Sequence, residues 1–441
     1  MVGSKHRIKL AVVGGGSTYT PELADGFARL RETLPIGELV LVDPAEERRE
    51  LVGGVVRRIL ARQGHPAVVT TTGELDAAVE GADAVLLQLR IGGQAARNRD
   101  ETWPLECGCV GQETTGAGGL AKALRTVPVV LEIAERVRRA NPDAWIVDFT
   151  NPVGIVTRAL LTAGHRAVGL CNVAIGFQRR FAGLLGVEPE RVLLDHVGLN
   201  HLTWERGVRL AGDGGSGGAG GAAGPDLLPG LLAEHGESLA RDLGLPVGLL
   251  RRLGVVPSYY LRYFYRHDTV VEELRERGSR AAEVAEIERR LLDLYADPAV
   301  DEKPKLLEQR GGAYYSEAAV ALVARLLGSG GVADAPGVQV VNVRNGRTMP
   351  FLPEDAVIEV PAEVGPDGAR PLPVAEVEPL YAGLIAHTTA YERLALEAAL
   401  RGGRDRVFDA LLAHPLVGQI EQADWLTDRL LAENRDYLAW A

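Results

Sequence analysis

Short apolar runs alternate with amphipathic stretches over about the first 170 residues of the chain. The runs occupy residues 8–13, 39–42, 84–89, 145–149 and 167–170. Residues 120–139 carry apolar side chains at helical spacing, among them Val127, Val130 and Val137. Strands that alternate with helices in this way predict a doubly wound parallel sheet of the Rossmann type.

The rhythm changes after about residue 200. Longer helices are expected at residues 280–295, 316–327 and 379–401, and a short strand pair at 338–343 and 356–360. We therefore expect an α/β protein in which a doubly wound parallel sheet is followed by an α+β domain, an arrangement that resembles the architecture of lactate and malate dehydrogenases. Its NAD-binding Rossmann-like domain would span residues 1–198, and a C-terminal α+β domain for substrate binding and oligomerisation would span residues 199–441.

The first apolar run leads directly into a glycine-rich turn, VVGGGSTYTP. Glycines at positions 14, 15 and 16 would let the backbone approach a pyrophosphate, and Ser17 and the following helix start would face its charge. The second run ends on Asp43, which is spaced to accept the ribose hydroxyls of NAD and disfavours the 2′-phosphate of NADP. The third glycine of the dinucleotide fingerprint is replaced by Tyr19, so a plain structural turn is the alternative.

Composition narrows the class of protein. The chain has 441 residues, of which 46% are hydrophobic, and a net charge of −11 that comes from interspersed acids and bases. This pattern suggests neither a nucleic-acid partner nor a membrane surface, and no apolar run approaches the roughly 18 residues that span a bilayer. Three cysteines without a signal peptide predict reduced thiols and a cytoplasmic protein.

Two features carry less chemistry. Cys107 and Cys109 form a C-x-C pair, for which ordinary buried thiols are a better interpretation than a metal site, because no second Cys/His cluster lies nearby. Residues 211–224, AGDGGSGGAGGAAG, have too little side chain to pack and are expected to form a flexible surface insertion.

Cys171 and Asn172 follow the last predicted strand, in GLCNVAIG, and His201 follows in GLNH. Ligands bind at the carboxyl ends of strands in open α/β sheets, so a thiolate and an imidazole could converge beside a nicotinamide. Such a pair suits Mn²⁺, Fe²⁺, Co²⁺ or Ni²⁺. A buried cysteine and a hydrogen-bonded core histidine are the alternative.

Several motifs then occur in a fixed order. They are GGGSTYTP, VGQETTGAGGLAKALRTVP, FTNP, CNVAIG, GLNH, PSYYLRYFY, RGGAYYSEAA, VNVRNG and LPEDAVIEVP. Together they closely resemble glycoside hydrolase family 4, particularly its 6-phospho-β-glucosidases, over nearly the whole chain.

The resemblance implies an unusual hydrolytic cycle. Bound NAD⁺ oxidises the sugar C3 hydroxyl, which makes the C2 proton acidic; a base removes it, the aglycone leaves C1, water adds, and NADH returns its hydride. A divalent metal such as Mn²⁺ stabilises the enolate, and the cycle has no net redox change.

The resemblance also assigns the reacting groups. Cys171 and His201 match the metal ligands, and Tyr260 matches the catalytic tyrosine, although Tyr259 and Tyr263 allow a one-residue error. Glu113 matches a residue that assists the tyrosine.

Other positions match contacts to the substrate and cofactor. Asn151 and Asn172 match substrate-binding positions, and Arg97 and Arg280 match contacts to the 6-phosphate, which guanidinium groups bind well. Arg90 is a further candidate close to the cofactor.

The expected substrate is a small phosphorylated glucoside or disaccharide, and a homodimer or homotetramer is typical of the family. Asn172 favours β-linked substrates, because α-selective members often have an aspartate there that can protonate the leaving oxygen. The alternatives are a 6-phospho-α-glycosidase, an NAD-dependent 2-hydroxy-acid dehydrogenase and an inactive NAD-binding sensor.

Overall fold

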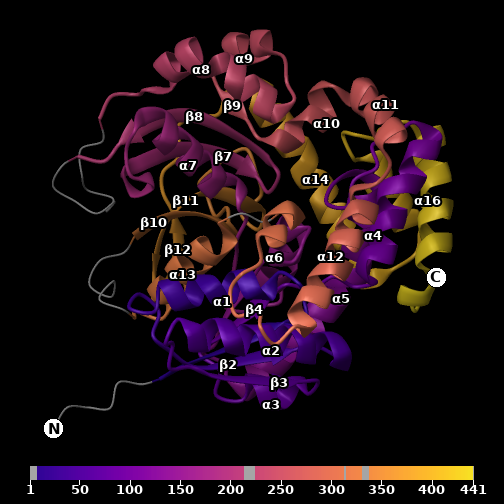
Figure 1. The fold of residues 1–441 in the computed structure, drawn as a ribbon. Helices are drawn as coiled ribbons and strands as arrows, with labels where there is room; N and C mark the ends of the chain where they lie inside the picture. The colour runs from indigo at the N-terminus through magenta and orange to yellow at the C-terminus, as the bar shows by residue number, and fades with distance from the viewer. Residues whose placement is uncertain (1–6, 213–223, 312–313, 330–336, 441) are drawn as a thin grey trace.

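A computed structural model describes residues 7–212, 224–311, 314–329 and 337–440, so residues 213–223 of the glycine-rich insertion lie outside the described part. Figure 1 shows β2 (Ile36–Val42) and β3 (Val68–Thr72) with α2 (Glu46–Arg62) and α3 (Leu75–Val79) at one end of the molecule, and α8 (Leu228–Leu243) and α9 (Val247–Leu253) at the opposite end. Among the described residues, no helix is both long and apolar enough to cross a membrane.

Among the described residues, the central sheet has nine strands in the order β12-β11-β10-β6-β5-β4-β1-β2-β3. Its six N-terminal strands are parallel, which confirms the predicted Rossmann-like sheet. They are β1 (Ile8–Val13), β2 (Ile36–Val42), β3 (Val68–Thr72), β4 (Ala84–Leu87), β5 (Trp145–Asp148) and β6 (Ala167–Gly169).

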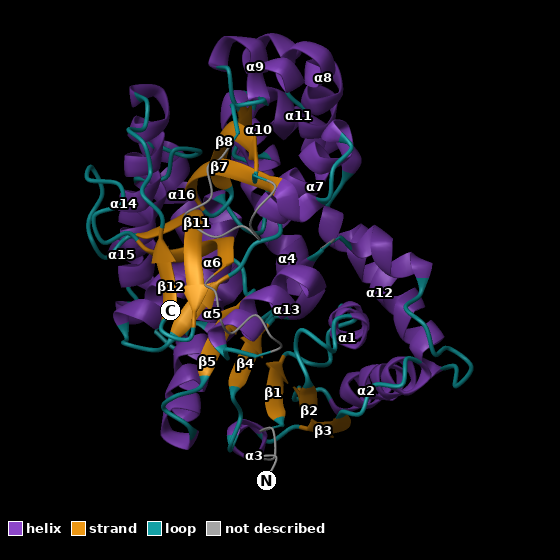
Figure 2. Cartoon of the chain, turned by 90° about the vertical axis from the view of Figure 1, so that its left-hand side faces the viewer, coloured by secondary structure: helices purple, strands orange, loops and turns teal. Residues whose placement is uncertain are grey.

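Helices cover both faces of this sheet, as the views in Figures 1 and 2 show. Alternate residues of β1 explain why: Leu10 and Val12 belong to one buried apolar cluster, and Ala11 and Val13 belong to a second cluster on the other face. The N-terminal helices are α1 (Thr20–Arg29), α2 (Glu46–Arg62), α3 (Leu75–Val79), α4 (Gly93–Thr102), α5 (Gly116–Ala140), α6 (Val153–Thr162) and α7 (Val173–Leu185).

The C-terminal half extends the same sheet. The antiparallel strands β10 (Gly337–Arg344), β11 (Val357–Gly365) and β12 (Gly368–Pro371) continue it beyond β6, to which β10 pairs through Asn342 and Gly169. The predicted strand pair at 338–343 and 356–360 therefore exists and belongs to the Rossmann sheet.

A second, three-stranded antiparallel sheet contains β7 (Val192–Leu199), β8 (Leu202–Leu210) and β9 (Val256–Pro257). The predicted boundary after residue 198 falls within β7, and the division into two domains stays a prediction. The remaining helices are α8 (Leu228–Leu243), α9 (Val247–Leu253), α10 (Arg262–Tyr265), α11 (His267–Arg277), α12 (Arg280–Ala296), α13 (Tyr315–Leu326), α14 (Pro379–Arg401), α15 (Arg404–Leu412) and α16 (Ile420–Asn434). The 3₁₀ turns are η1 (Trp103–Cys107), η2 (Pro189–Arg191), η3 (Tyr259–Leu261), η4 (Lys305–Arg310) and η5 (Arg435–Tyr437).

Candidate active site

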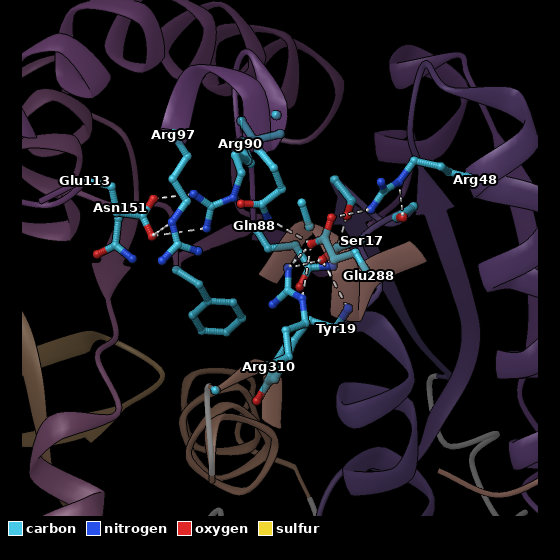
Figure 3. Close-up of a pocket in the computed structure, with 18 of the residues that line it drawn as sticks. Ser17, Tyr19, Arg48, Gln88, Arg90, Arg97, Glu113, Asn151, Glu288 and Arg310 are labelled. Carbon is cyan, nitrogen blue, oxygen red and sulfur yellow. Dashed lines mark hydrogen bonds and ion pairs between the residues drawn. The ribbon is translucent and has the colours of Figure 1, made fainter. Parts of the chain in front are cut away.

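A cavity of about 790 Å³ is lined by residues that follow β1, β2 and β4 and by residues of α4, α12 and the end of η4. This volume lies within the usual range for small-molecule and cofactor sites. Most of the predicted site residues line it, namely Gly14, Gly16, Ser17, Asp43, Arg90, Arg97, Glu113, Asn151, Asn172, His201 and Tyr260. Figure 3 shows the part of this cavity that the charged residues form.

The glycine-rich turn is built around Asp43. Gly14 has a φ of +85°, a backbone conformation that glycine adopts without strain. The Gly16 amide donates to Asp43 Oδ2 over 3.1 Å, and a Cβ atom at Gly16 would come within 2.7 Å of the Asp43 carboxyl carbon. Gly15 is equally constrained, because a Cβ there would approach Leu41 within 2.8 Å. The turn therefore requires small residues and leaves the backbone open to a ligand.

Arg310, from the C-terminal half of the chain, contacts this turn and pairs there with Glu288. Arg310 donates from Nε to Thr18 Oγ1 over 2.9 Å, and its Nη2 lies 3.0 Å from Glu288 Oε1. Glu288 on α12 also pairs with Arg48 at 3.5 Å. Burial opposes ionisation of Glu288, but the charges of Arg310 and Arg48 lower its pKa. Sequence reasoning gave Arg310 and Glu288 no role, although RGGAYYSEAA was among the motifs.

Glu113 organises a second charged cluster at the other end of the cavity. Lys122 Nζ lies 2.6 Å from Glu113 Oε2, Arg97 Nε lies 3.1 Å from Oε1, and Arg90 also pairs with this carboxylate. Burial alone would raise the pKa of Glu113, but the three cations lower it well below its ordinary value. Arg97 also binds Glu101 over 2.7 Å. The five side chains carry one positive charge in excess, which favours an anionic ligand.

His201 and Tyr260 form a stacked pair, with ring centroids 3.6 Å apart and planes 7° apart. His201 has a φ of +63°, which is uncommon outside glycine and indicates a conformation held by its surroundings. Its Nδ1 lies 3.1 Å from Thr114 Oγ1, so Nε2 is the nitrogen suited to bind a metal ion. Burial lowers the pKa of His201 to about 4, which keeps the ring neutral, as a ligand must be.

Tyr260 is the member of the tyrosine cluster that faces the cavity. Tyr259 is 42% exposed and its hydroxyl accepts a hydrogen bond from Arg262, whereas Tyr263 is buried. Burial raises the pKa of Tyr260 well above its ordinary value, the charge of Cys171 acts in the same direction, and Arg97 opposes them. A role as a base therefore requires additional positive charge beside the phenol.

Cys171 and Asn172 follow the end of β6 after a single intervening residue, Leu170, close to the position predicted. Asn172 is the residue that precedes α7 and lines the cavity, while Cys171 is buried behind it. Burial raises the pKa of the Cys171 thiol, and the charge of Glu359 raises it further. Asn151 Oδ1 is buried and has no hydrogen-bond partner among the described residues, so it suits a ligand donor in the cavity.

The structure does not bring Arg280 into the cavity. It is the first residue of α12, it is half exposed, and it pairs with Glu283 and with the carbonyl oxygen of Gln309. Arg289, further along the same helix, lines the cavity. The role of Arg280 in phosphate binding stays a prediction.

The C-x-C pair, Cys107 and Cys109, is not part of the predicted metal site, whose ligands are Cys171 and His201. Cys107 is half-buried and Cys109 is buried, and both are free thiols. Among the described residues, no three His, Cys, Asp or Glu side chains form a metal-binding group. Cys171 and His201 would therefore leave positions on an ion for other ligands.

Two family models cover most of the chain. Residues 9–187 match "Family 4 glycosyl hydrolase", and residues 196–417 match "Family 4 glycosyl hydrolase C-terminal domain". The chain belongs to glycosyl hydrolase family 4. The resemblance predicted from the motifs is thereby confirmed.

Relatives within family 4 extend over the whole chain. The "Probable 6-phospho-beta-glucosidase" of Bacillus subtilis is 37% identical and covers 98% of this chain and 97% of its own. The 6-phospho-beta-glucosidase of Escherichia coli is 34% identical over 98% and 96% of the two chains. A structure of the Thermotoga maritima 6-phospho-beta-glucosidase with NAD and glucose 6-phosphate is 32% identical, with a TM-score of 0.89 over 98% of this chain and 99% of that one. A lactate dehydrogenase, 12% identical with a TM-score of 0.52, shares the fold alone.

Proposed function

We propose that this protein is a 6-phospho-β-glucosidase, which hydrolyses 6-phospho-β-glucosides to glucose 6-phosphate and an alcohol or sugar with NAD and a divalent metal, Mn²⁺. The observation that carries the proposal is the single cavity that combines the glycine-rich turn, a cationic cluster and the His201–Tyr260 pair. The Thermotoga maritima relative, whose structure has been solved with manganese, NAD⁺ and glucose 6-phosphate, supports it.

The residues fit both groups. Gly14, Gly15, Gly16 and Ser17 would hold the pyrophosphate of NAD, and Asp43 would accept the ribose hydroxyls. A neutral His201 and the Cys171 thiolate would hold the metal ion. When bound, NAD takes a hydride from the sugar C3 and returns it, and the ion stabilises negative charge on the neighbouring oxygens.

The protein's own residues would move the proton. Tyr260, as a phenolate, removes the proton from C2 of the oxidised sugar, and elimination then expels the aglycone from C1. Glu113 would assist indirectly, because it fixes Arg97 beside Tyr260. The positive charge of Arg97 lowers the pKa of Tyr260, whereas the charge of Glu113 itself raises it. Arg90 and Lys122 bind the same carboxylate, so the cluster keeps its geometry while the substrate enters.

The remaining polar groups would orient the sugar. The amides of Asn151 and Asn172 are suited to sugar hydroxyls, and Arg97, with Arg280 as a predicted second contact, would bind the 6-phosphate. Asn172 has no proton to give to a leaving oxygen, which is the reason for the proposed β preference. A phosphorylated glucoside or disaccharide is thus the proposed substrate. A cytoplasmic homodimer or homotetramer, with its three cysteines reduced, completes the proposal.

A panel of phosphorylated and unphosphorylated α- and β-glucosides, assayed with NAD⁺, Mn²⁺ and a thiol reductant, tests this function. We expect cleavage of the phosphorylated β-glucosides, loss of activity on chelation, and no net formation of NADH. Faster cleavage of the α-anomers would favour a 6-phospho-α-glycosidase, and a phospho-alpha-glucosidase of Clostridium acetobutylicum is among the relatives at 27% identity. Stoichiometric accumulation of NADH would favour a dehydrogenase.

A further inference from the structure

A chain of buried polar side chains connects the two sheets behind the cavity. His196 on β7 bonds through Nδ1 to Glu205 on β8 over 2.6 Å, and through Nε2 to Glu359 on β11 over 3.1 Å. Glu359 Oε2 accepts hydrogen bonds from the side-chain amides of Asn200 and Asn342, both at 2.9 Å. We call these five residues the β7–β11 network. His196, Glu205, Glu359 and Asn342 are at most 1% exposed.

The network pairs one imidazole with two carboxylates. The two carboxylates raise the pKa of His196 to about 10 against the effect of burial, and burial raises the pKa of Glu205. A protonated His196 balances one ionised carboxylate, so with both carboxylates ionised the network has one negative charge in excess. Burial opposes the ionisation of Glu359, but bonds to His196, Asn200 and Asn342 lower its pKa. A buried, unbalanced charge is costly unless a cation lies close by.

The network ends at the two predicted metal ligands. The Asn200 side chain bonds to Cys171 as well as to Glu359, and its amide has two hydrogens for these two acceptors. Asn200 directly precedes His201 in the chain, and Asn342 pairs with Gly169 of β6, two residues before Cys171. Glu359 is therefore hydrogen-bonded to close neighbours of both predicted ligands. A divalent ion between Cys171 and His201 would supply the missing positive charge.

We propose that Glu359 is a positioning residue for the divalent metal: through Asn200 it orients the Cys171 thiolate, and its buried charge increases the affinity of the site for a dication. The proposal rests on the proposed function, because it assumes that Cys171 and His201 bind the metal. Outer partners of metal ligands commonly act in this way.

Metal binding itself provides the test. We expect E359Q to weaken Mn²⁺ binding by about 10–100-fold, measured by electron paramagnetic resonance with NAD⁺ and glucose 6-phosphate present. In the Co²⁺-substituted protein, the thiolate-to-metal absorption band should weaken or shift. E359D, which keeps the charge, should recover part of the affinity. N200A should alter the Co²⁺ band while NAD⁺ binding reports that the protein remains folded.

Glu392 offers a matched control. It is a buried glutamate that lines a separate small cavity behind His201, and Arg158 is its nearby cation. E392Q should keep the wild-type Mn²⁺ affinity and Co²⁺ spectrum. If E359Q and N200A bind both ions as the wild type does, the proposal is wrong although the metal site stands. If the wild type binds no divalent ion, the metal part of the proposed function fails first.

Discussion

Tyr260 shows how strongly a reactive group can depend on its neighbours. Its ring is fixed against His201, and burial holds its pKa well above the ordinary value. We expect Tyr260→Phe to lower kcat by about 10²–10⁴, the usual contribution of a positioned base, while NAD⁺ and Mn²⁺ binding change little. Steady-state kinetics and product formed in D₂O, with deuterium at C2 in the wild type, check this prediction.

The neighbouring Tyr259 and Tyr263 serve as controls for the assignment of Tyr260 as the base. Tyr259→Phe and Tyr263→Phe should keep kcat near the wild-type value, because Tyr259 bonds to Arg262 and Tyr263 is buried away from the large cavity. A large loss of kcat in either of them, with a normal Tyr260→Phe enzyme, would move the base to another position.

Arg97 is the best-placed candidate for the 6-phosphate. We expect Arg97→Ala to raise KM for a phosphorylated β-glucoside by roughly 10–100-fold, because a charge-assisted hydrogen bond contributes about 1.5–3 kcal/mol. Glu113 keeps Arg90 and Lys122 in this variant, so the cluster should persist. Arg280→Ala tests the second predicted contact, and Arg347→Ala, at an exposed arginine paired with Glu354, is the control. An unchanged KM in Arg97→Ala would exclude this contact.

At the scale of single elements, the turn after β1 depends on its lack of side chains. A Cβ at residue 16 would meet the Asp43 carboxyl at 2.7 Å, a contact so close that the turn or the Asp43 side chain would have to shift. We expect Gly16→Ala to weaken NAD⁺ binding by about 1–3 kcal/mol through overpacking, measured by calorimetry. Gly383→Ala, on α14 with no atom within 4 Å of the added Cβ, should bind NAD⁺ normally. Equal NAD⁺ affinities in the two variants would contradict the proposed role of the glycine-rich turn in binding NAD⁺.

Local sequence patterns predicted the elements that consist of consecutive apolar residues. The runs at β1, β4 and β5 are apolar on both faces, so the central sheet followed from the sequence. The edge strand β3, with the sequence VVTTT, is mostly half-exposed and lacks that signal, and α4 is too polar to show a helical stripe. Arg97 lies on α4 and was therefore found through the family resemblance alone.

Long-range contacts were beyond the sequence patterns. Lys122 lies within a predicted helix, and nothing in its neighbourhood indicates that it binds Glu113. Arg310 reaches the glycine-rich turn from nearly 300 residues away along the chain, and Glu288 pairs with Arg310. The pairing of β10 with β6 likewise depends on tertiary packing, which no spacing of apolar residues expresses.

For the whole molecule, the β7–β11 network predicts a pH dependence of stability. The folded state raises the pKa of His196 from 6.5 to about 10, so its stabilising contribution is fully present below about pH 6.5 and is lost as the pH rises through 10. Chemical unfolding should give a free energy that falls over this range, and His196→Gln should flatten the slope. His235→Gln, on the surface helix α8, should keep the wild-type slope. Parallel slopes in wild type and His196→Gln would contradict the predicted charge.

The position of β10 beside β6 also matters while the chain is being synthesised. About 170 residues separate the two strands, so β6 leaves the ribosome roughly 10–30 s before its neighbour does. During that time the nascent sheet has an unpaired edge that could join another chain. The protein's yield in cells should therefore depend on elongation speed and chaperones, even though the finished enzyme covers that edge.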